Sequence, residues 1–238
     1  MREPGGTMAI KIIVSYDGTE NDTDALALGR LLTQGGGWLA LAYVRHTVES
    51  GQGREQLAQH EAEELLENGA RWLDEPDVPR HVVLSPSTPE GLRDLAEREG
   101  AQIVVFGSEY RTSPGHVQPG TSAQRLLEGG PIAIALAPAG LQDRLPIAVD
   151  TIAAVSEDGD PGPRETAASL AARLGATVVP RAGEQAGLVV VGSRPGTAAG
   201  RITLSAAAQY LIELLCSPVI VLPHGVALRF GGGESHTT

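Results

Sequence analysis

Few residues in this 238-residue sequence have the types and spacing that enzymatic chemistry requires. Lys11 is the only lysine, so the Gly-Lys-Ser/Thr tripeptide of a P-loop nucleotidase is missing. The first predicted strand is not followed by Gly-x-Gly-x-x-Gly, Gly-x-Ser-x-Gly is absent, and the six histidines lack paired metal-ligand spacing. The single cysteine, Cys216, excludes a Cys-x-x-Cys motif and is expected to be a buried small side chain rather than a nucleophile. We therefore predict neither catalytic residues nor a metal site.

The residues that could bind a ligand are glycines and small polar residues beside apolar runs. Asp17 and Gly107 each follow such a run, whereas Gly120 and Thr121 precede a helical pattern. A helix that opens in this way offers free N–H groups and a positive dipole end to an anion. Each residue also has an ordinary alternative role, because aspartate and threonine cap helices and glycine ends strands in tight turns. The residue types alone leave both roles open.

Short apolar runs alternate with amphipathic segments along the chain, which predicts a doubly wound, mostly parallel α/β sheet. The predicted strands cover 10–16, 38–44, 82–84, 103–106 and 132–136, and the predicted helices cover 21–33, 54–74, 89–98 and 121–128. The acidic residues of the long helix are expected to form a solvated face.

The pattern then restarts, which indicates an internal duplication. Three segments recur in the same order, namely 14–18 at 155–159, 104–108 at 189–193, and 131–138, in shortened form, at 218–223. We predict a complete domain over residues 8–140 and a shortened one over 146–230. The second copy lacks about 56 residues. A strand order of 3-2-1-4-5 in the first copy would then leave 2-1-4-5 in the second. The direction of the strand at 176–180 stays open, because only about eight residues join it to the next strand.

Composition limits the classes of partner. The net charge of −11 disfavours nucleic acid and acidic membranes, because both require a concentrated basic surface. No apolar run is long enough to span a bilayer, and the sequence does not open with the pattern of an export signal. A lone cysteine fits a reducing compartment. We therefore expect a cytoplasmic protein.

The chain resembles the universal stress protein family, in its tandem form, over almost its whole length. The resemblance rests on VSYDG, IVVFGS and PIAIALAP in the first copy and on LVVVGSRPG and CSPVIVLP in the second. It implies an adenine nucleotide alpha hydrolase-like fold whose members dimerise along the last strand, and many of which bind ATP or AMP. It further implies that strands 132–136 and 219–222 pair the two domains as an internal pseudo-dimer. Further association into a homodimer stays open.

The resemblance also implies a nucleotide site. ATP-binding members show Gly-x-x-Gly, nine residues, then Gly-Ser/Thr, and the spacing from Gly107 to Gly120 matches this pattern. Tyr110 replaces the second glycine, and Glu109 occupies a position where arginine is common. The second copy keeps the arginine as Arg194 but loses the final Gly-Ser/Thr, and we expect Arg194 to be a solvated surface residue rather than a phosphate ligand.

In the family, the aspartate after the first strand contacts the adenosine part, and backbone near the end of the second strand contacts adenine. The residues expected to bind ATP or AMP, with Mg²⁺ accompanying ATP, are Ser15, Asp17, Val44, Gly107, Gly120, Thr121 and Ser122. The second copy offers Asp158 as the counterpart of Asp17.

Two functions follow from these observations. The first is a stress-response binding module that holds an adenine nucleotide in the first domain, with slow hydrolysis or none. The alternative is a nucleotide-free interaction or scaffold protein in which both phosphate loops have decayed, as the changes at Tyr110 and Glu109 suggest. A true ATPase would lack an identifiable base for the attacking water.

Overall fold

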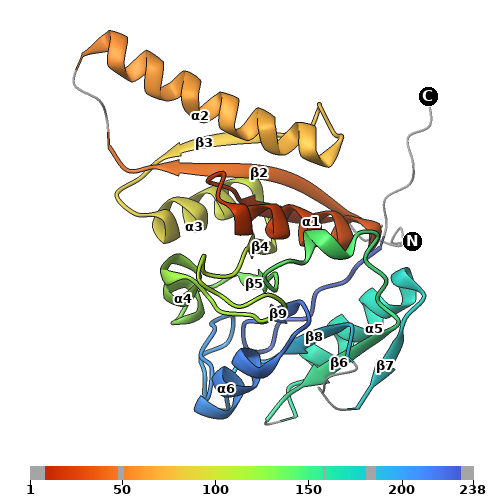
Figure 1. Ribbon diagram of the computed structural model, residues 1–238. Helices are drawn as coiled ribbons and strands as arrows, with labels where there is room; N and C mark the ends of the chain where they lie inside the picture. The colour runs from red at the N-terminus through yellow and green to blue at the C-terminus, as the bar shows by residue number, and fades with distance from the viewer. Residues whose placement is uncertain (1–8, 48–50, 158, 181–185, 232–238) are drawn as a thin grey trace, which may run out of the picture.

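The computed structural model describes residues 9–47, 51–157, 159–180 and 186–231. In these residues the chain forms one mixed sheet flanked by helices on both faces, which confirms the predicted α/β class (Figure 1). The strand order is β3-β2-β1-β4-β5-β9-β8-β6-β7. The strands are β1 (Ile10–Ser15), β2 (Gly37–Arg45), β3 (Arg80–Leu84), β4 (Ile103–Phe106), β5 (Ala133–Leu136), β6 (Thr151–Val155), β7 (Thr177–Val179), β8 (Leu188–Val191) and β9 (Val219–Val221).

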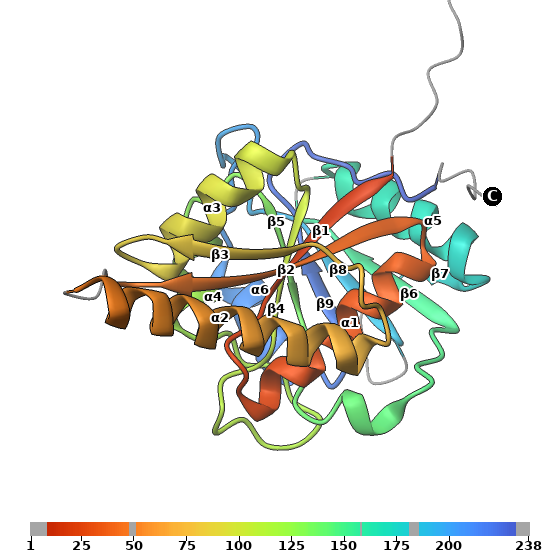
Figure 2. The same cartoon turned by 90° about the horizontal axis from the view of Figure 1, so that it is seen from above.

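The helices divide between the two faces of the sheet (Figure 2). One core packs α1 (Glu20–Gln34), α2 (Gln52–Leu73) and α5 (Gly162–Leu174) against the sheet. The other core contains α3 (Thr88–Glu99), α4 (Thr121–Leu127) and α6 (Ala206–Leu214). A short 3-10 helix, η1 (Gln142–Arg144), lies in the connection from β5 to β6.

The first half contains β1 to β5 in the predicted 3-2-1-4-5 order, and all four neighbouring pairs are parallel. Strand β1 lies between β2 and β4, and its apolar side chains alternate between the two cores, which explains its continuous apolar sequence. The direction of chain travel across the sheet reverses between β1 and β4. Ligands of open α/β sheets bind in the crevice beyond the carboxyl ends of the strands at such a point.

The second half follows the predicted shortened order, with β7, β6, β8 and β9 as neighbours. The structure answers the question left open at 176–180, because β7 runs parallel to β6. Strand β7 has only three residues, so the chain must return by only about 10 Å to begin β8. This distance explains how so short a connection is sufficient. Most of that connection, residues 181–185, lies outside the described residues.

The strands predicted to form the seam do pair with each other. Strands β5 and β9 are antiparallel, with Ala135 opposite Ile220. Both side chains are fully buried. We predicted two tandem sheets; the pairing instead joins them into one, because each last strand has an edge of backbone N–H and C=O groups with which the other can pair. A second link comes from Ile202, whose backbone accepts the N–H of Gly129 at 2.8 Å and donates to the carbonyl of Gly130 at 2.9 Å.

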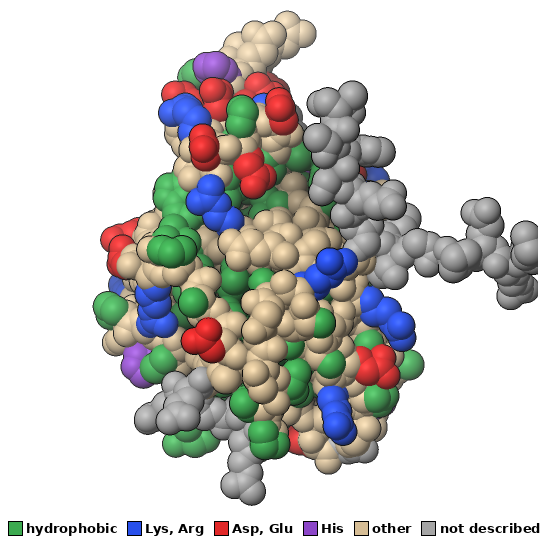
Figure 3. All heavy atoms as spheres, turned by 90° about the vertical axis from the view of Figure 1, so that its right-hand side faces the viewer, with side chains coloured by type: hydrophobic (Ala, Val, Ile, Leu, Met, Phe, Trp, Pro, Cys, Tyr) green, Lys and Arg blue, Asp and Glu red, His purple; other side chains and the backbone are tan. Residues whose placement is uncertain are grey.

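Helix α2 presents its acidic residues to solvent, as predicted. Its exposed residues include Glu61, Glu63, Glu64 and Glu67. Figure 3 shows acidic side chains gathered at the end of the molecule that α2 forms. Element boundaries differ from the predicted ones by one or two residues in most cases; α2, for example, begins at Gln52. The domain limits 8–140 and 146–230 stay predictions.

Candidate functional site

The loops that follow β1 and β4 pack directly against each other. A Cβ atom added to Gly107 would lie 2.1 Å from the backbone oxygen of Asn21 in the first turn of α1, so only glycine fits there. The side-chain amide of Asn21 donates to the carbonyls of Ser108 at 3.0 Å and Glu109 at 2.8 Å. Gly107 therefore has a packing role in addition to any role toward a ligand.

Ser108 holds the loop between β4 and α4 in shape. Its buried hydroxyl donates to the carbonyl of Ala137 at 2.7 Å and accepts the N–H of Gln118 at 3.2 Å. The backbone of Ser108 also forms an antiparallel bridge with Pro119. This bridge brings Gly120 close to the carboxyl end of β4, so that two parts of the predicted phosphate motif lie together.

Helix α4 begins immediately after Gly120, which is its N-cap. Glycine has no side chain to accept the N–H groups of the first turn, and a Cβ atom added to Gly120 would meet no atom within 4 Å. Thr121 is the first helical residue and is exposed, and Ser122 is half-buried. The N-cap role considered for Thr121 is therefore wrong, and the start of α4 faces open space.

Asp17 lies in a tight turn with a second carboxylate, that of Asp22. The Asp22 carboxylate accepts the N–H of Asp17 at 2.6 Å, and the Asp17 carboxylate accepts the N–H of Thr19 at 3.2 Å. Burial, together with the neighbouring Asp17 carboxyl, raises the pKa of Asp22 to about 8. Burial is also the main cause of the raised pKa of the Tyr16 hydroxyl, and the nearby Asp22 and Asp17 raise this pKa further. Asp22 therefore holds a proton near neutral pH.

A cleft of about 460 Å³ extends from Asp17 between the end of β2 and α2. Its lining residues are Asp17, Tyr43, Arg45, His46, Thr47, Ala58, Glu61, Ala62 and Leu65. The guanidinium of Arg45 bonds to Glu55 at 2.9 Å and to Gln59 at 3.2 Å, so it fixes α2 over the cleft.

The structure places the predicted site residues in two groups. Ser15 pairs with Ala42 at the end of β1, and Asp17 lines the cleft. Gly107 and Gly120 belong to the neighbouring loop and are not part of the described cleft lining. The side chain of Val44 is buried in the core against α3, so only its backbone could contact a ligand, as predicted.

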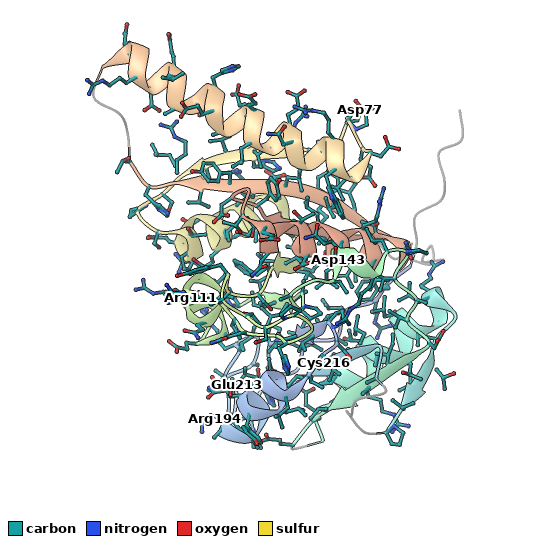
Figure 4. All side chains as sticks on the ribbon, in the orientation of Figure 1. Asp77, Arg111, Asp143, Arg194, Glu213 and Cys216 are labelled. Carbon is teal, nitrogen blue, oxygen red and sulfur yellow. The ribbon has the colours of Figure 1, made fainter. Side chains whose placement is uncertain are left out.

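The unusual residues of the first loop interact with one another. The carboxylate of Glu109 accepts the N–H of Arg111 at 2.8 Å. The guanidinium of Arg111 lies 4.9 Å from the ring centre of Tyr110, which is 67% exposed. Figure 4 shows Arg111 projecting away from the body of the molecule. Glu109 is thus turned toward its own loop.

The second half repeats the hydrogen-bond pattern of this loop. The buried hydroxyl of Ser193 donates to the carbonyl of Leu222 at 2.9 Å and accepts the N–H of Thr203 at 3.3 Å. Arg194 is exposed, as expected, whereas Cys216 is exposed although we expected it to be buried (Figure 4). Asp158 lies outside the described residues. Ser205 occupies the position that corresponds to Gly120.

Sequence reasoning missed the roles of Asn21 and Asp22. Helix α1 has Thr19 as its N-cap, so Asn21 and Asp22 both lie in its first turn. No local pattern shows that the amide of Asn21 reaches the β4 loop. The Thr19-x-x-Asp22 capping-box pattern, in contrast, could have indicated that Asp22 turns back toward the residues before the helix. The described residues contain no cluster of three or more His, Cys, Asp or Glu side chains that could hold a metal ion.

Comparison with known proteins supports the fold and the family. The model of the universal stress protein family matches residues 8–138, just over half of the chain. A universal stress protein from Archaeoglobus fulgidus DSM 4304 superposes with a TM-score of 0.68 at 13% identity, over 90% of this chain and 98% of that one. A functionally unknown protein from Pseudomonas aeruginosa PAO1 gives a TM-score of 0.58 at 16% identity, over 91% and 93%. No curated protein matches significantly in sequence.

The strand order and the helices on both faces thus define an open, doubly wound α/β protein. The chain belongs to the universal stress protein family. Within the described residues, no helix has both the length and the apolar character needed to cross a membrane.

Proposed function

We propose that this universal stress protein is a binding module that holds an adenine nucleotide, ATP or AMP, in its first half. Mg²⁺ would accompany ATP through the phosphate oxygens. The two halves act as a pseudo-dimer produced by duplication, and hydrolysis is slow or does not occur. We place the protein in the cytoplasm, in keeping with its single cysteine.

The open start of α4 carries this proposal. Gly120 leaves the first turn of the helix without a side-chain cap, in open space, and beside the carboxyl end of β4. The phosphates would occupy this position, where backbone N–H groups and the helix dipole attract negative charge. The hydroxyls of Thr121 and Ser122 would supply further donors to phosphate oxygens.

The cleft beside Asp17 suits the other end of the nucleotide. It combines a carboxylate, an aromatic ring from Tyr43 and backbone at the end of β2. The Asp17 carboxylate can accept a ribose hydroxyl, and the apolar wall from α2 can cover a base. The reversal of strand order between β1 and β4 places these groups and the α4 start at the same edge of the sheet.

The contact between Gly107 and Asn21 favours the alternative, an interaction protein without nucleotide. Because Gly107 is closed against the backbone of α1, phosphate cannot approach it from that side. Glu109 and Asp17 add negative charge nearby. In this alternative the loops serve packing alone, and the ligand is another protein.

A single substitution separates these two functions. Gly120 has an ordinary backbone conformation and open space around it, so Gly120→Leu should fold normally yet obstruct the phosphates. Gly53 on α2 also has open space and no positive φ, so Gly53→Leu is the matched control. ATP should raise the melting temperature of the wild type and the control but not that of Gly120→Leu. An equal rise in all three would exclude the assigned site, and no rise in any would favour the interaction protein.

A further inference from the structure

A second cleft lies on the opposite edge of the sheet from the candidate nucleotide site. Its volume is about 760 Å³, and it lies at the amino ends of β4 and β5, beside Gln102 and Ile132. Because β9 runs antiparallel to β5, the chain that leaves the carboxyl end of β9 reaches the same place at Pro223. Both halves therefore contribute to this cleft, which we call the seam cleft. Small-molecule sites commonly have volumes of this size and lie where two units meet.

The floor of the seam cleft is apolar. Ile132, Pro223 and Leu228 are buried there, and Ala96 of α3 also lines it. A hydrocarbon group placed on this floor would be removed from water, which favours binding in proportion to the apolar area that is covered. An ion with polar atoms alone would gain nothing from the floor. The ligand that fits therefore has an apolar part.

The rim of the seam cleft carries positive charge and N–H donors. It includes Arg93 from α3, Arg201 from the second half and the half-buried Gln102. The amide oxygen of Gln102 accepts the N–H of Lys11 at 2.7 Å, which leaves the NH₂ group of this amide as a donor. The only carboxylate of the lining is that of Glu97. Two guanidinium groups and one carboxylate leave one excess positive charge, in a chain whose net charge is −11.

Arg201 is fixed at its backbone yet keeps donors for a ligand. Its carbonyl accepts the N–H of His224 at 2.9 Å, and its guanidinium donates to the carbonyl of Gly129 at 3.3 Å. A guanidinium has more N–H groups than this bond uses, and its planar fork matches the two oxygens of a carboxylate. Arg93 is exposed and contacts Asp94 at 3.2 Å, so we expect it to contribute less than Arg201.

The carboxyl end of α3 also borders the seam cleft, where free carbonyl groups would repel an anion. Two of these carbonyl groups already have partners. The carbonyl of Ala96 accepts the N–H of Ala101 at 2.8 Å, and that of Glu99 accepts the ammonium group of Lys11 at 2.8 Å. The positive charge of Lys11 therefore offsets the negative end of the helix.

We propose that the seam cleft binds a small apolar carboxylic acid in its ionised form. The hydrocarbon part lies on the floor, and the carboxylate accepts hydrogen bonds from Arg201 and Gln102, with Arg93 adding positive charge. One excess positive charge on the rim matches a single carboxylate better than a phosphate dianion. The inference does not rest on the proposed function, because the nucleotide site lies at the other edge of the sheet.

Indole-3-acetate is the probe, because it joins an aromatic ring to one carboxylate. Indole-3-ethanol keeps the ring and replaces the carboxylate with a neutral hydroxyl. Ligand-observed NMR titration into the full chain should show saturable binding of the acid and much weaker binding of the alcohol. Arg201→Gln should weaken binding of the acid by at least about tenfold, the effect of one charge-assisted hydrogen bond. Arg194→Gln, at an exposed arginine of the same loop that does not line the cleft, should bind like the wild type.

Arg93 has a matched control on its own helix. Arg98 contacts its sequence neighbour Glu99 at 3.4 Å, much as Arg93 contacts Asp94, but it does not line the cleft. Arg93→Gln should weaken binding of the acid by about two- to fivefold, as expected for an exposed charge. Arg98→Gln should leave it unchanged. Circular dichroism melting should show that these variants are folded.

Any of four results would overturn the inference. The first three are a folded wild type that does not bind indole-3-acetate, equal affinity for the acid and the alcohol, and unchanged affinity for the acid in Arg201→Gln. The fourth is loss of binding in Gly120→Leu, because that loss would place the probe in the nucleotide site. Failure of the proposed function is distinguishable, since it appears as wild-type protein that does not bind ATP, whatever the result with indole-3-acetate.

Discussion

At the scale of single residues, the most informative group is Asp22. The pKa of its carboxyl group is raised from the ordinary value of 3.8 to about 8 in the folded state. At neutral pH the folded chain therefore keeps a proton on Asp22 that the unfolded chain has lost. The folded state therefore holds more protons than the unfolded state between about pH 4 and pH 8. In that window the contribution of Asp22 to the free energy of unfolding falls as the pH rises, by at most about 1.4 kcal/mol per pH unit for one proton.

The substitution Asp22→Asn tests this conclusion, because asparagine keeps an acceptor oxygen and removes the charge. We expect the variant to lose most of the decline in stability between pH 5 and pH 8 and to exceed the wild type at pH 8. Urea unfolding at several pH values measures both effects. Asp77→Asn, at an exposed position beyond α2, is the control and should follow the wild type (Figure 4). An unchanged slope in Asp22→Asn would contradict the assignment.

The two loop serines make equivalent hydrogen bonds. Removing the hydroxyl of Ser108 leaves the Ala137 carbonyl and the Gln118 N–H without a partner, and removing that of Ser193 has the same consequence in the second half. Ser108→Ala and Ser193→Ala should each lower the free energy of unfolding by about 1–3 kcal/mol. Ser113→Ala, an exposed change in the first loop, should cost little. Urea midpoints that differ between the two buried variants by more than their uncertainty would argue against equivalent roles.

At the scale of elements, the sequence was a good guide wherever a local pattern sufficed. Continuous apolar runs, followed by Asp17-Gly18 in one case and by Gly107 in the other, predicted β1 and β4. The proline-bounded runs predicted the strands that meet at the seam. The direction of β7 required knowing that it has only three residues, which its sequence does not show. The Asn21 contact was equally hidden, since it joins segments 87 residues apart.

The candidate site shows the same division. The position of Gly120 before a helix was predicted from spacing. Only the fold shows that the space around this uncapped helix start is open. The hydrogen bond from Ser205 to Glu157 could not be predicted, because the two residues lie 48 residues apart and meet only after β6 and β8 pair.

At the scale of the whole molecule, one apolar core extends through both halves. The cluster on the α1 face includes Leu32 of α1 and Leu170 of α5. A Cβ atom on Gly35, after α1, would lie 2.7 Å from Leu170, so the halves touch directly. The two halves should therefore unfold together rather than as independent units.

Tryptophan fluorescence can test this coupling, because Trp38 and Trp72 both lie in the first half. Leu170→Ala, in the second half, should destabilise the protein by about 2–5 kcal/mol and shift the tryptophan midpoint by the same amount as the circular dichroism midpoint. Arg164→Ala, at an exposed position of α5, should leave both midpoints in place. If the unfolding midpoint measured by tryptophan fluorescence is the same in Leu170→Ala as in the wild type, the halves unfold separately.

The central claim concerns a single nucleotide site in a chain with two similar halves. Titration calorimetry of ATP with Mg²⁺, into wild-type protein stripped of bound ligand, tests it most directly. Gly120 leaves the start of α4 without a side-chain cap, whereas Ser205 caps α6 at the corresponding position. We therefore predict saturable binding with one site per chain. Two sites per chain, or no heat together with an unchanged melting temperature, would contradict the account.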